Sequence, residues 1–249
     1  MGHLPPAGDI ALVVIGALVA GFLNGLSGTG YALASLGFWL HAMPPATAAP
    51  LVALCSVVGH IQSLPRIWHG VVWSRLWPFL VAGLIGVPVG TLLLEHVHVQ
   101  PLKLGVGLLL IFYSAWMGLV RRPPIVTGGG RLADAAIGFT GGVMGGMASI
   151  SGPVPTIWVQ LRGWNKHEQR GVNQPFNMAV LAAALLSSAV AGFLDRTFLL
   201  WAVVTLPTTL VGARLGLSLY GRINDVQFRG IVLVLLGLSG ATLIASSLR

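Results

Sequence analysis

Hydrophobic residues fill nearly the whole chain in long stretches, and only short polar segments separate them. Six of these stretches are long enough to cross the roughly 30 Å hydrocarbon core of a bilayer as helices, at about 1.5 Å per residue. We predict the six spans at residues 46–64, 76–94, 102–120, 172–193, 197–220 and 229–248. The pattern therefore predicts an all-α polytopic membrane protein.

Two further apolar stretches are broken in the middle by small and polar residues. The first reads GFLNGLSGTGYALASLGFWL (residues 21–40) and the second reads GVMGGMASISGPVPTIWVQL (residues 142–161). We expect each resulting piece, 10–26 and 31–43 and then 133–148 and 153–161, to be short for a full crossing. A bilayer tolerates a broken helix only where protein or a water-filled cavity receives the freed backbone groups, so the duplicated break predicts an internal polar site.

The two breaks belong to a longer internal repeat. Glycines of the two halves match in order at spacings of 121 and then 126: Gly21 with Gly142, Gly25 with Gly146, Gly86 with Gly212, and Gly90 with Gly216. We therefore expect one transmembrane domain (1–249) with repeat 1 at 9–120, a linker at 121–131 and repeat 2 at 132–249. Each repeat is expected to be a broken, re-entrant helical hairpin followed by three transmembrane helices.

The basic residues predict how the repeats are oriented. If each broken segment crosses once, seven Lys and Arg residues face one side and six the other, which is no bias. If each broken segment returns to the side it came from, ten face the cytoplasm and three face outside. The positive-inside rule favours the second arrangement. It predicts inverted repeats, a cytoplasmic linker, and both termini outside.

The composition agrees with a membrane protein and excludes several other classes. Hydrophobic residues make up 55% and charged residues 8% of the chain, and the mean hydropathy is +0.85. The net charge of +8 mostly reflects basic loop residues, so we expect no binding to nucleic acid. No Lys or Arg precedes Arg66, so we expect the first apolar run to be mature structure rather than a signal peptide. The single cysteine, Cys55, forms no disulfide within the chain.

The breaks suggest a chemistry for the internal site. A half-helix that begins near Tyr31 or Pro153 would point its N–H groups and positive dipole end into the membrane interior, where anions are favoured. Proline suits a first helical position, and hydroxyl groups cap helix ends or bind a ligand. The candidate substrate-binding residues at the breaks are Asn24, Ser27, Gly28, Thr29, Gly30, Tyr31, Ser149, Ser151, Gly152 and Pro153. The alternative is that these small residues serve close helix packing.

Other polar residues inside apolar surroundings are secondary candidates. Asn173, Gln174 and Asn177 surround Pro175 and either line the substrate cavity or cap a helix entrance. His60 is a candidate for gating or coupling, or a hydrogen-bonded packing residue. Arg214 is also a candidate for gating or coupling, unless its side chain snorkels toward the cytoplasm.

The broken segments resemble those of the TauE/SafE family, also called the 4-toluene sulfonate uptake permease family. Members carry a G-x-x-S-G-x-x-G-x-G-G-G-like run, small apolar residues and a proline in each half. Here the first run is Asn24-Gly25-Leu26-Ser27-Gly28-Thr29-Gly30-Tyr31, without the glycine triplet, and in the second Ser149, Ser151 and Gly152 precede Pro153 and Pro155. The resemblance covers essentially the whole chain and implies a bacterial inner-membrane carrier of sulfite, sulfonates or similar small anions.

Several functions are disfavoured by what the spans lack. All six carboxylates fall at or near span ends, which leaves no pair in the membrane for a divalent metal. No glycine-rich stretch has the Gly-Lys-Ser/Thr ending of a P-loop, so transport would be secondary or channel-like. We expect no cofactor. An assembly or scaffold protein is one alternative to the anion carrier. An intramembrane serine enzyme is another, but no embedded His or acid is placed to activate Ser149 or Ser151, so we expect no enzyme. The sequence also allows a homodimer.

Overall fold

The computed structural model describes residues 6–27, 30–67, 70–94, 96, 99–120, 125–164 and 166–219, with isolated positions between 230 and 247. The described part contains helices and no strand. The helices are α1 (Ala7–Ser27), α2 (Tyr31–Trp39), α3 (Pro45–Ile67), α4 (Trp73–Leu94), α5 (Val99–Leu119), α6 (Gly130–Ala148), α7 (Pro153–Leu161), α8 (Lys166–Val190) and α9 (Arg196–Leu219). The predicted all-α class is confirmed.

Four described helices contain stretches that are long and apolar enough to cross a membrane: Ala7–Leu26, Pro45–Gln62, Trp73–Leu94 and Arg196–Leu219. Three of them coincide with predicted spans, and α5 and α8 cover two more. The first third of α8 is rich in polar residues, and the apolar part of α5 is the shorter stretch Leu104–Trp116. The last predicted span, 229–248, lies mostly outside the described residues.

The outward faces of the long helices are apolar. On α4 the side chains of Ile85 and Leu92 are exposed, and on α9 so are Leu199 and Val203. Soluble monomers rarely expose apolar surface on this scale, whereas a bilayer solvates it. The protein is therefore a multi-pass membrane protein.

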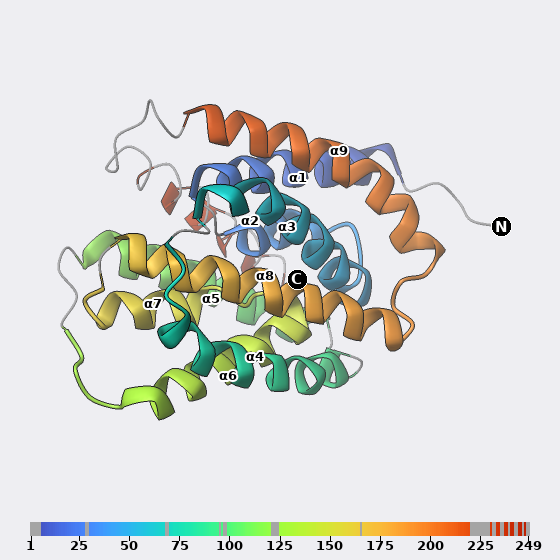
Figure 1. Ribbon diagram of the computed structural model, residues 1–249. Coiled ribbons are helices and arrows are strands. Elements are labelled where there is room, and N and C mark those ends of the chain that lie inside the picture. Colours follow the sequence, from blue (N-terminus) through green and yellow to red (C-terminus); the bar gives the residue numbers. More distant parts are fainter. Residues whose placement is uncertain are drawn as a thin grey trace.

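Two pairs of helices form opposite sides of the bundle. In Figure 1 α1 lies beside α9 at the top, α4 lies beside α6 at the bottom, and α8 crosses between the two pairs. Glycines allow this close approach, because a Cβ at Gly25 would meet the carbonyl oxygen of Ala213, and one at Gly142 would meet that of Gly83.

Candidate functional site

The second break is a short turn between α6 and α7. Ser149 follows α6 in the left-handed conformation, with φ at 57°. The N–H of Ile150 donates to the carbonyl oxygen of Met144 at 3.2 Å, a bond typical of helix C-termini. Helix α7 starts at Pro153, whose nitrogen carries no hydrogen that would need a partner. The predicted start of this half-helix is confirmed.

Helix α7 folds back along α6. Its Trp158 donates from Nε1 to Oδ1 of Asp134, near the start of α6, at 2.7 Å. Closer to the break, Gly145 of α6 lies against Ser151 and Gly141 lies against Pro155. Residues late in α6 thus meet residues early in α7, so the second broken segment is a hairpin.

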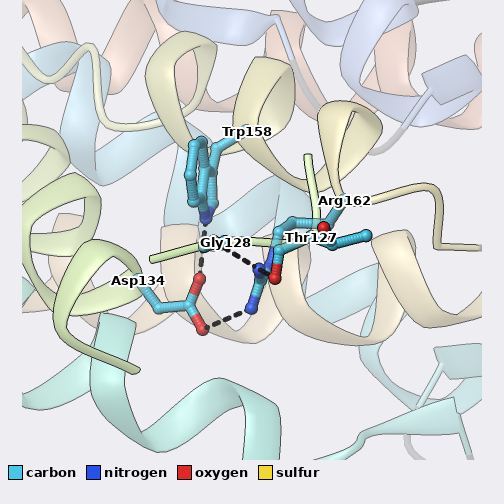
Figure 2. Close-up of polar contacts among 5 residues, drawn as sticks. All are labelled: Thr127, Gly128, Asp134, Trp158 and Arg162. Carbon is cyan, nitrogen blue, oxygen red and sulfur yellow. Dashed lines mark hydrogen bonds and ion pairs between the residues drawn. The ribbon is translucent and has the colours of Figure 1, made fainter. Parts of the chain in front are cut away.

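A polar cluster fixes the open end of this hairpin. Figure 2 shows the Asp134 carboxylate between the indole of Trp158 and the guanidinium of Arg162. The ion pair joins Oδ2 of Asp134 to Nη2 of Arg162 at 3.7 Å. Nη1 of Arg162 donates to the carbonyl oxygens of Gly128 at 2.9 Å and Thr127 at 3.4 Å. The cluster ties the end of α7 to the segment that leads into α6.

The first break has the same architecture. Helix α1 ends at Ser27, whose side chain lies outside the described residues together with Gly28 and Thr29. Gly30 precedes α2 with φ at 89°, a conformation that glycine adopts without steric cost. Helix α2 begins at Tyr31, as predicted, and Trp39 Nε1 near its end donates to the carbonyl oxygen of Val13 at 3.0 Å. The first broken segment is therefore also a hairpin.

The lengths of the hairpin arms correct one expectation. The prediction that every piece is short for a crossing is wrong for α1, which contains an apolar stretch of 20 residues. The helix begins at Ala7, with Asp9 in its first turn. A carboxylate there interacts favourably with the positive end of the helix dipole. Helices α2 and α7 have nine residues each, so the returning arms are short, as predicted.

The polar groups of the second break are buried and engaged with two neighbouring helices. The Ser149 hydroxyl donates to the carbonyl oxygen of Ala49 in α3 at 2.6 Å. The Ser151 hydroxyl donates to Oδ1 of Asn177 in α8 at 2.9 Å, and Gly152 lies beside the same amide. The structure thus brings together four of the predicted site residues.

We expect substitutions of Ser149 to separate its hydrogen bond from its backbone conformation. Ser149→Ala removes the bond to Ala49 and keeps a side chain in the left-handed region, whereas Ser149→Gly removes the bond and relieves the strain. The left-handed conformation costs a non-glycine residue roughly 1 kcal/mol. Ser149→Gly should therefore unfold at a higher temperature than Ser149→Ala in the same detergent. Equal melting temperatures of the two variants would contradict this assignment of strain.

Two polar residues at the first break contact different helices. The Tyr31 hydroxyl forms a 2.7 Å hydrogen bond with Oγ1 of Thr209 in α9, so this ring is held against the bundle. Asn24, in the last turns of α1, is buried, and its amide lies against Gly59 of α3.

Helix α3 connects the two breaks. The carbonyl oxygen of Ala49 accepts a hydrogen bond from the Ser149 hydroxyl, and Gly59 faces Asn24. These two positions are ten residues apart, or about 15 Å along a helix. In addition, Ile150 belongs to the same hydrophobic cluster as Tyr31. Both breaks therefore lie in one central region of the bundle.

The remaining candidates lie in different surroundings. Asn173 and Gln174 are buried in α8, one turn before Asn177, so they belong to the interior rather than to an exposed helix entrance. His60 is buried in α3, one residue beyond Gly59. Arg214 is exposed on α9, which agrees with a snorkelling side chain and not with an internal site.

Sequence reasoning missed several residues of this region. Ser56 and Gly59 of α3 and Thr205 and Thr209 of α9 lie in apolar runs that we took as ordinary spans. Cys55 donates to Oγ1 of Thr205 at 3.5 Å, which extends the polar contacts around Tyr31. The only signal in the sequence is the polarity of Ser56, Thr205 and Thr209 within predicted spans.

The half-helices differ in the donors that they offer to a ligand. The first N–H groups of a helix have no partner within the helix. Helix α2 starts with Tyr31, Ala32 and Leu33, all of which carry an N–H, whereas Pro153 and Pro155 of α7 carry none. The N-terminus of α2 therefore offers more N–H groups to a ligand than that of α7.

Two hairpins with buried polar breaks, inside an all-helical multi-pass protein, define a membrane protein built around an internal polar site. The family model described as sulfite exporter TauE/SafE matches residues 13–243. The chain belongs to this family of membrane transporters for sulfite and related anions, which confirms the resemblance seen in the sequence. Comparison with curated proteins and with solved structures gives no match.

Proposed function

We propose that the chain is a secondary transporter, and not an enzyme, that carries small sulfur-containing anions across the inner membrane. The observation that carries this proposal is the pair of helix breaks, where helix ends and buried amide and hydroxyl groups meet in the centre of the bundle. The proposed substrate site contains Asn24, Ser27, Gly28, Thr29, Gly30, Tyr31, Ser149, Ser151, Gly152, Pro153, Asn173, Gln174 and Asn177. Substrate moves by alternating access between two inverted repeats.

The glycine contacts support the proposed repeat. Gly21 lies against Thr209, and Gly142 lies against Gly83. The two contacts match, because Gly142 is 121 positions after Gly21 and Thr209 is 126 positions after Gly83. The other matched glycines behave alike: Gly25 meets Ala213 as Gly146 meets Val87, Gly212 meets Leu18 as Gly86 meets Phe139, and Gly216 meets Phe22 as Gly90 meets Val143. Helix α1 of one half thus packs on α9 of the other as α6 packs on α4.

The directions of the helices support inversion of the halves. Helix α3 starts near the end of α6, at the Ala49 to Ser149 bond, and ends close to the start of α4, which runs parallel to α6. Helices α3 and α6 therefore run in opposite directions. Helix α1 is parallel to α3. Val13, early in α1, contacts Trp39, which lies shortly before α3, and Asn24, late in α1, contacts Gly59 within α3. These directions support the proposal that the two hairpins enter the bundle from opposite sides.

A contact between the halves supports a rocking motion. Arg75 of α4 pairs with Glu168 of α8 at 2.9 Å, and its guanidinium lies 4.7 Å from the ring centroid of Trp164. Both charged side chains are about one-third exposed, so such an ion pair contributes little to stability and is readily broken. We propose that this contact opens when the site faces the cytoplasm.

Transport of the anion is tested by flux into liposomes that contain the purified protein. We expect protein-dependent, saturable uptake of sulfite, thiosulfate or a sulfonate, and a rise in melting temperature with the same anion that Ser151→Ala weakens. Dicarboxylates serve as the comparison class. Binding without flux would favour an assembly protein, covalent labelling of Ser151 by a serine-reactive probe would favour an enzyme, and anion binding unchanged by substitutions at either break would refute the site.

A further inference from the structure

Two buried oxygen atoms at the first break have no hydrogen-bond partner among the described residues. They are Oδ1 of Asn24 in α1 and Oγ of Ser56 in α3. The two residues are only 3% and 1% exposed. A buried polar atom without a partner costs free energy and is uncommon in native structures. These two atoms therefore point to a ligand.

The two oxygens lie along the same helix contact. The amide nitrogen of Asn24 lies against Gly59, where a side chain would leave it no room, so the oxygen of the same amide lies beside this contact. Ser56 precedes Gly59 by three positions, so both occupy one face of α3. Helix α1 ends at Ser27, three residues beyond Asn24. Its last carbonyl oxygens lack partners within the helix and form the negative end of its dipole.

The chemistry of these groups selects a cation. The amide oxygen of Asn24 and the last carbonyl oxygens of α1 are acceptors, and a serine oxygen can also serve as a ligand. Divalent cations prefer carboxylate ligands. In the described part of the chain, no group of three His, Cys, Asp or Glu residues could hold a metal ion, and Asp134 and Glu168 are engaged with arginines. Neutral oxygens suit a monovalent ion instead.

We propose that a sodium ion binds between α1 and α3 at the first break, held by Asn24 Oδ1 and Ser56 Oγ and favoured by the negative end of the α1 dipole. Broken membrane helices commonly use their C-terminal ends in this way. The proposed site is distinct from the N-terminus of α2, which favours the anion.

The described residues at the matching positions of the second break differ from those of this site. At the spacing of 121, Asn24 corresponds to Gly145, Gly59 to Val180 and Ser56 to Asn177. Gly145 indeed lies against Val180, and Oδ1 of Asn177 already accepts the hydroxyl of Ser151. Gly145 has no side-chain oxygen in place of that of Asn24, and the oxygen of Asn177 is already engaged, so we infer that this sodium site has no counterpart at the second break.

The sodium ion would couple to the anion, a consequence that rests on the proposed function. The negative end of α1 and the positive start of α2 are separated only by residues 28–30. A cation at one and an anion at the other attract each other across this break. Sodium should then raise the affinity for the anion, and the anion should raise the affinity for sodium by the same factor.

The site itself is tested without any anionic substrate. The melting temperature of the purified protein is measured in NaCl, KCl and choline chloride at equal ionic strength. We expect the melting temperature to rise saturably with the sodium concentration. Potassium should need at least a tenfold higher concentration for the same rise, and choline should cause none. Ser56→Ala and Asn24→Ala should lose the rise, while Ser188→Ala should keep it, because Ser188 is equally buried but lies in α8, eleven residues beyond Asn177.

The outcomes separate this proposal from the proposed function. Equal melting in all three salts, which would also mean that water fills the site, overturns the sodium site even if anion flux is observed. A sodium response that survives in both Ser56→Ala and Asn24→Ala also overturns it. If Asn24→Ala does not fold, Ser56→Ala decides, since it removes a single oxygen. A sodium response without anion flux would support the site and refute only the transport proposal.

Discussion

Replacement of Gly142 by leucine is expected to prevent stable folding. A Cβ at this position would collide with the carbonyl oxygen and Cα of Gly83 on α4. Backbone atoms cannot rotate away as a side chain would, so α4 and α6 must separate along their whole contact. Overpacking usually costs about 1–3 kcal/mol, and we expect the upper end here. The measurement is the yield of monodisperse protein in detergent and its melting temperature.

The chain provides both a control and a second test for this prediction. A Cβ at Gly105 of α5 meets nothing within 4 Å, so Gly105→Ala should fold and gain up to about 1 kcal/mol in helix propensity. Gly21→Leu should fail as Gly142→Leu does, because Gly21 meets the backbone of Thr209 at the equivalent contact. A Gly142→Leu protein with the same melting temperature as the wild type would disprove the close packing of α4 on α6 proposed here.

The positions of the helix breaks could be predicted because local chemistry determines them. Gly30 takes a positive φ and Pro153 needs no N–H partner, so each marks the start of a half-helix wherever the rest of the chain lies. The basic loop residues also predict how the hairpins are oriented in the membrane, and this orientation stays a prediction. These signals depend on residue type and order alone, which a single sequence contains.

The partners of the polar residues could not be predicted, because they come from helices far away in the sequence. Nothing near Ser149 indicates that it bonds to Ala49, and nothing near Tyr31 indicates Thr209. Likewise, nothing in the sequence around Ser56 indicates that its hydroxyl is buried without a partner among the described residues. The exposure of Arg214 likewise depends on the face that α9 turns outward, which packing against α1 decides.

Exchange of Asn177 for aspartate is expected to abolish anion binding while the protein stays folded. The two side chains have the same shape, and a carboxylate accepts the Ser151 hydroxyl as the amide oxygen does. A negative charge about 4 Å from a bound anion costs roughly 4 kcal/mol at an effective dielectric constant of about 20. Since about 1.4 kcal/mol is a tenfold change, we expect binding to weaken at least about a hundredfold.

The neutral variant Asn177→Ala isolates the effect of charge. It removes the amide without adding a charge, so we expect it to bind the anion only about tenfold more weakly, the effect of one hydrogen bond to a charged group. Both variants are compared with the wild type by titration with sulfite at about pH 8, where an ordinary aspartate is ionised. Far greater weakening by aspartate than by alanine is the signature of an anion held near Asn177. If Asn177→Asp binds as tightly as Asn177→Ala, the second break does not hold the anion, and the donors at the start of α2 would have to hold it alone.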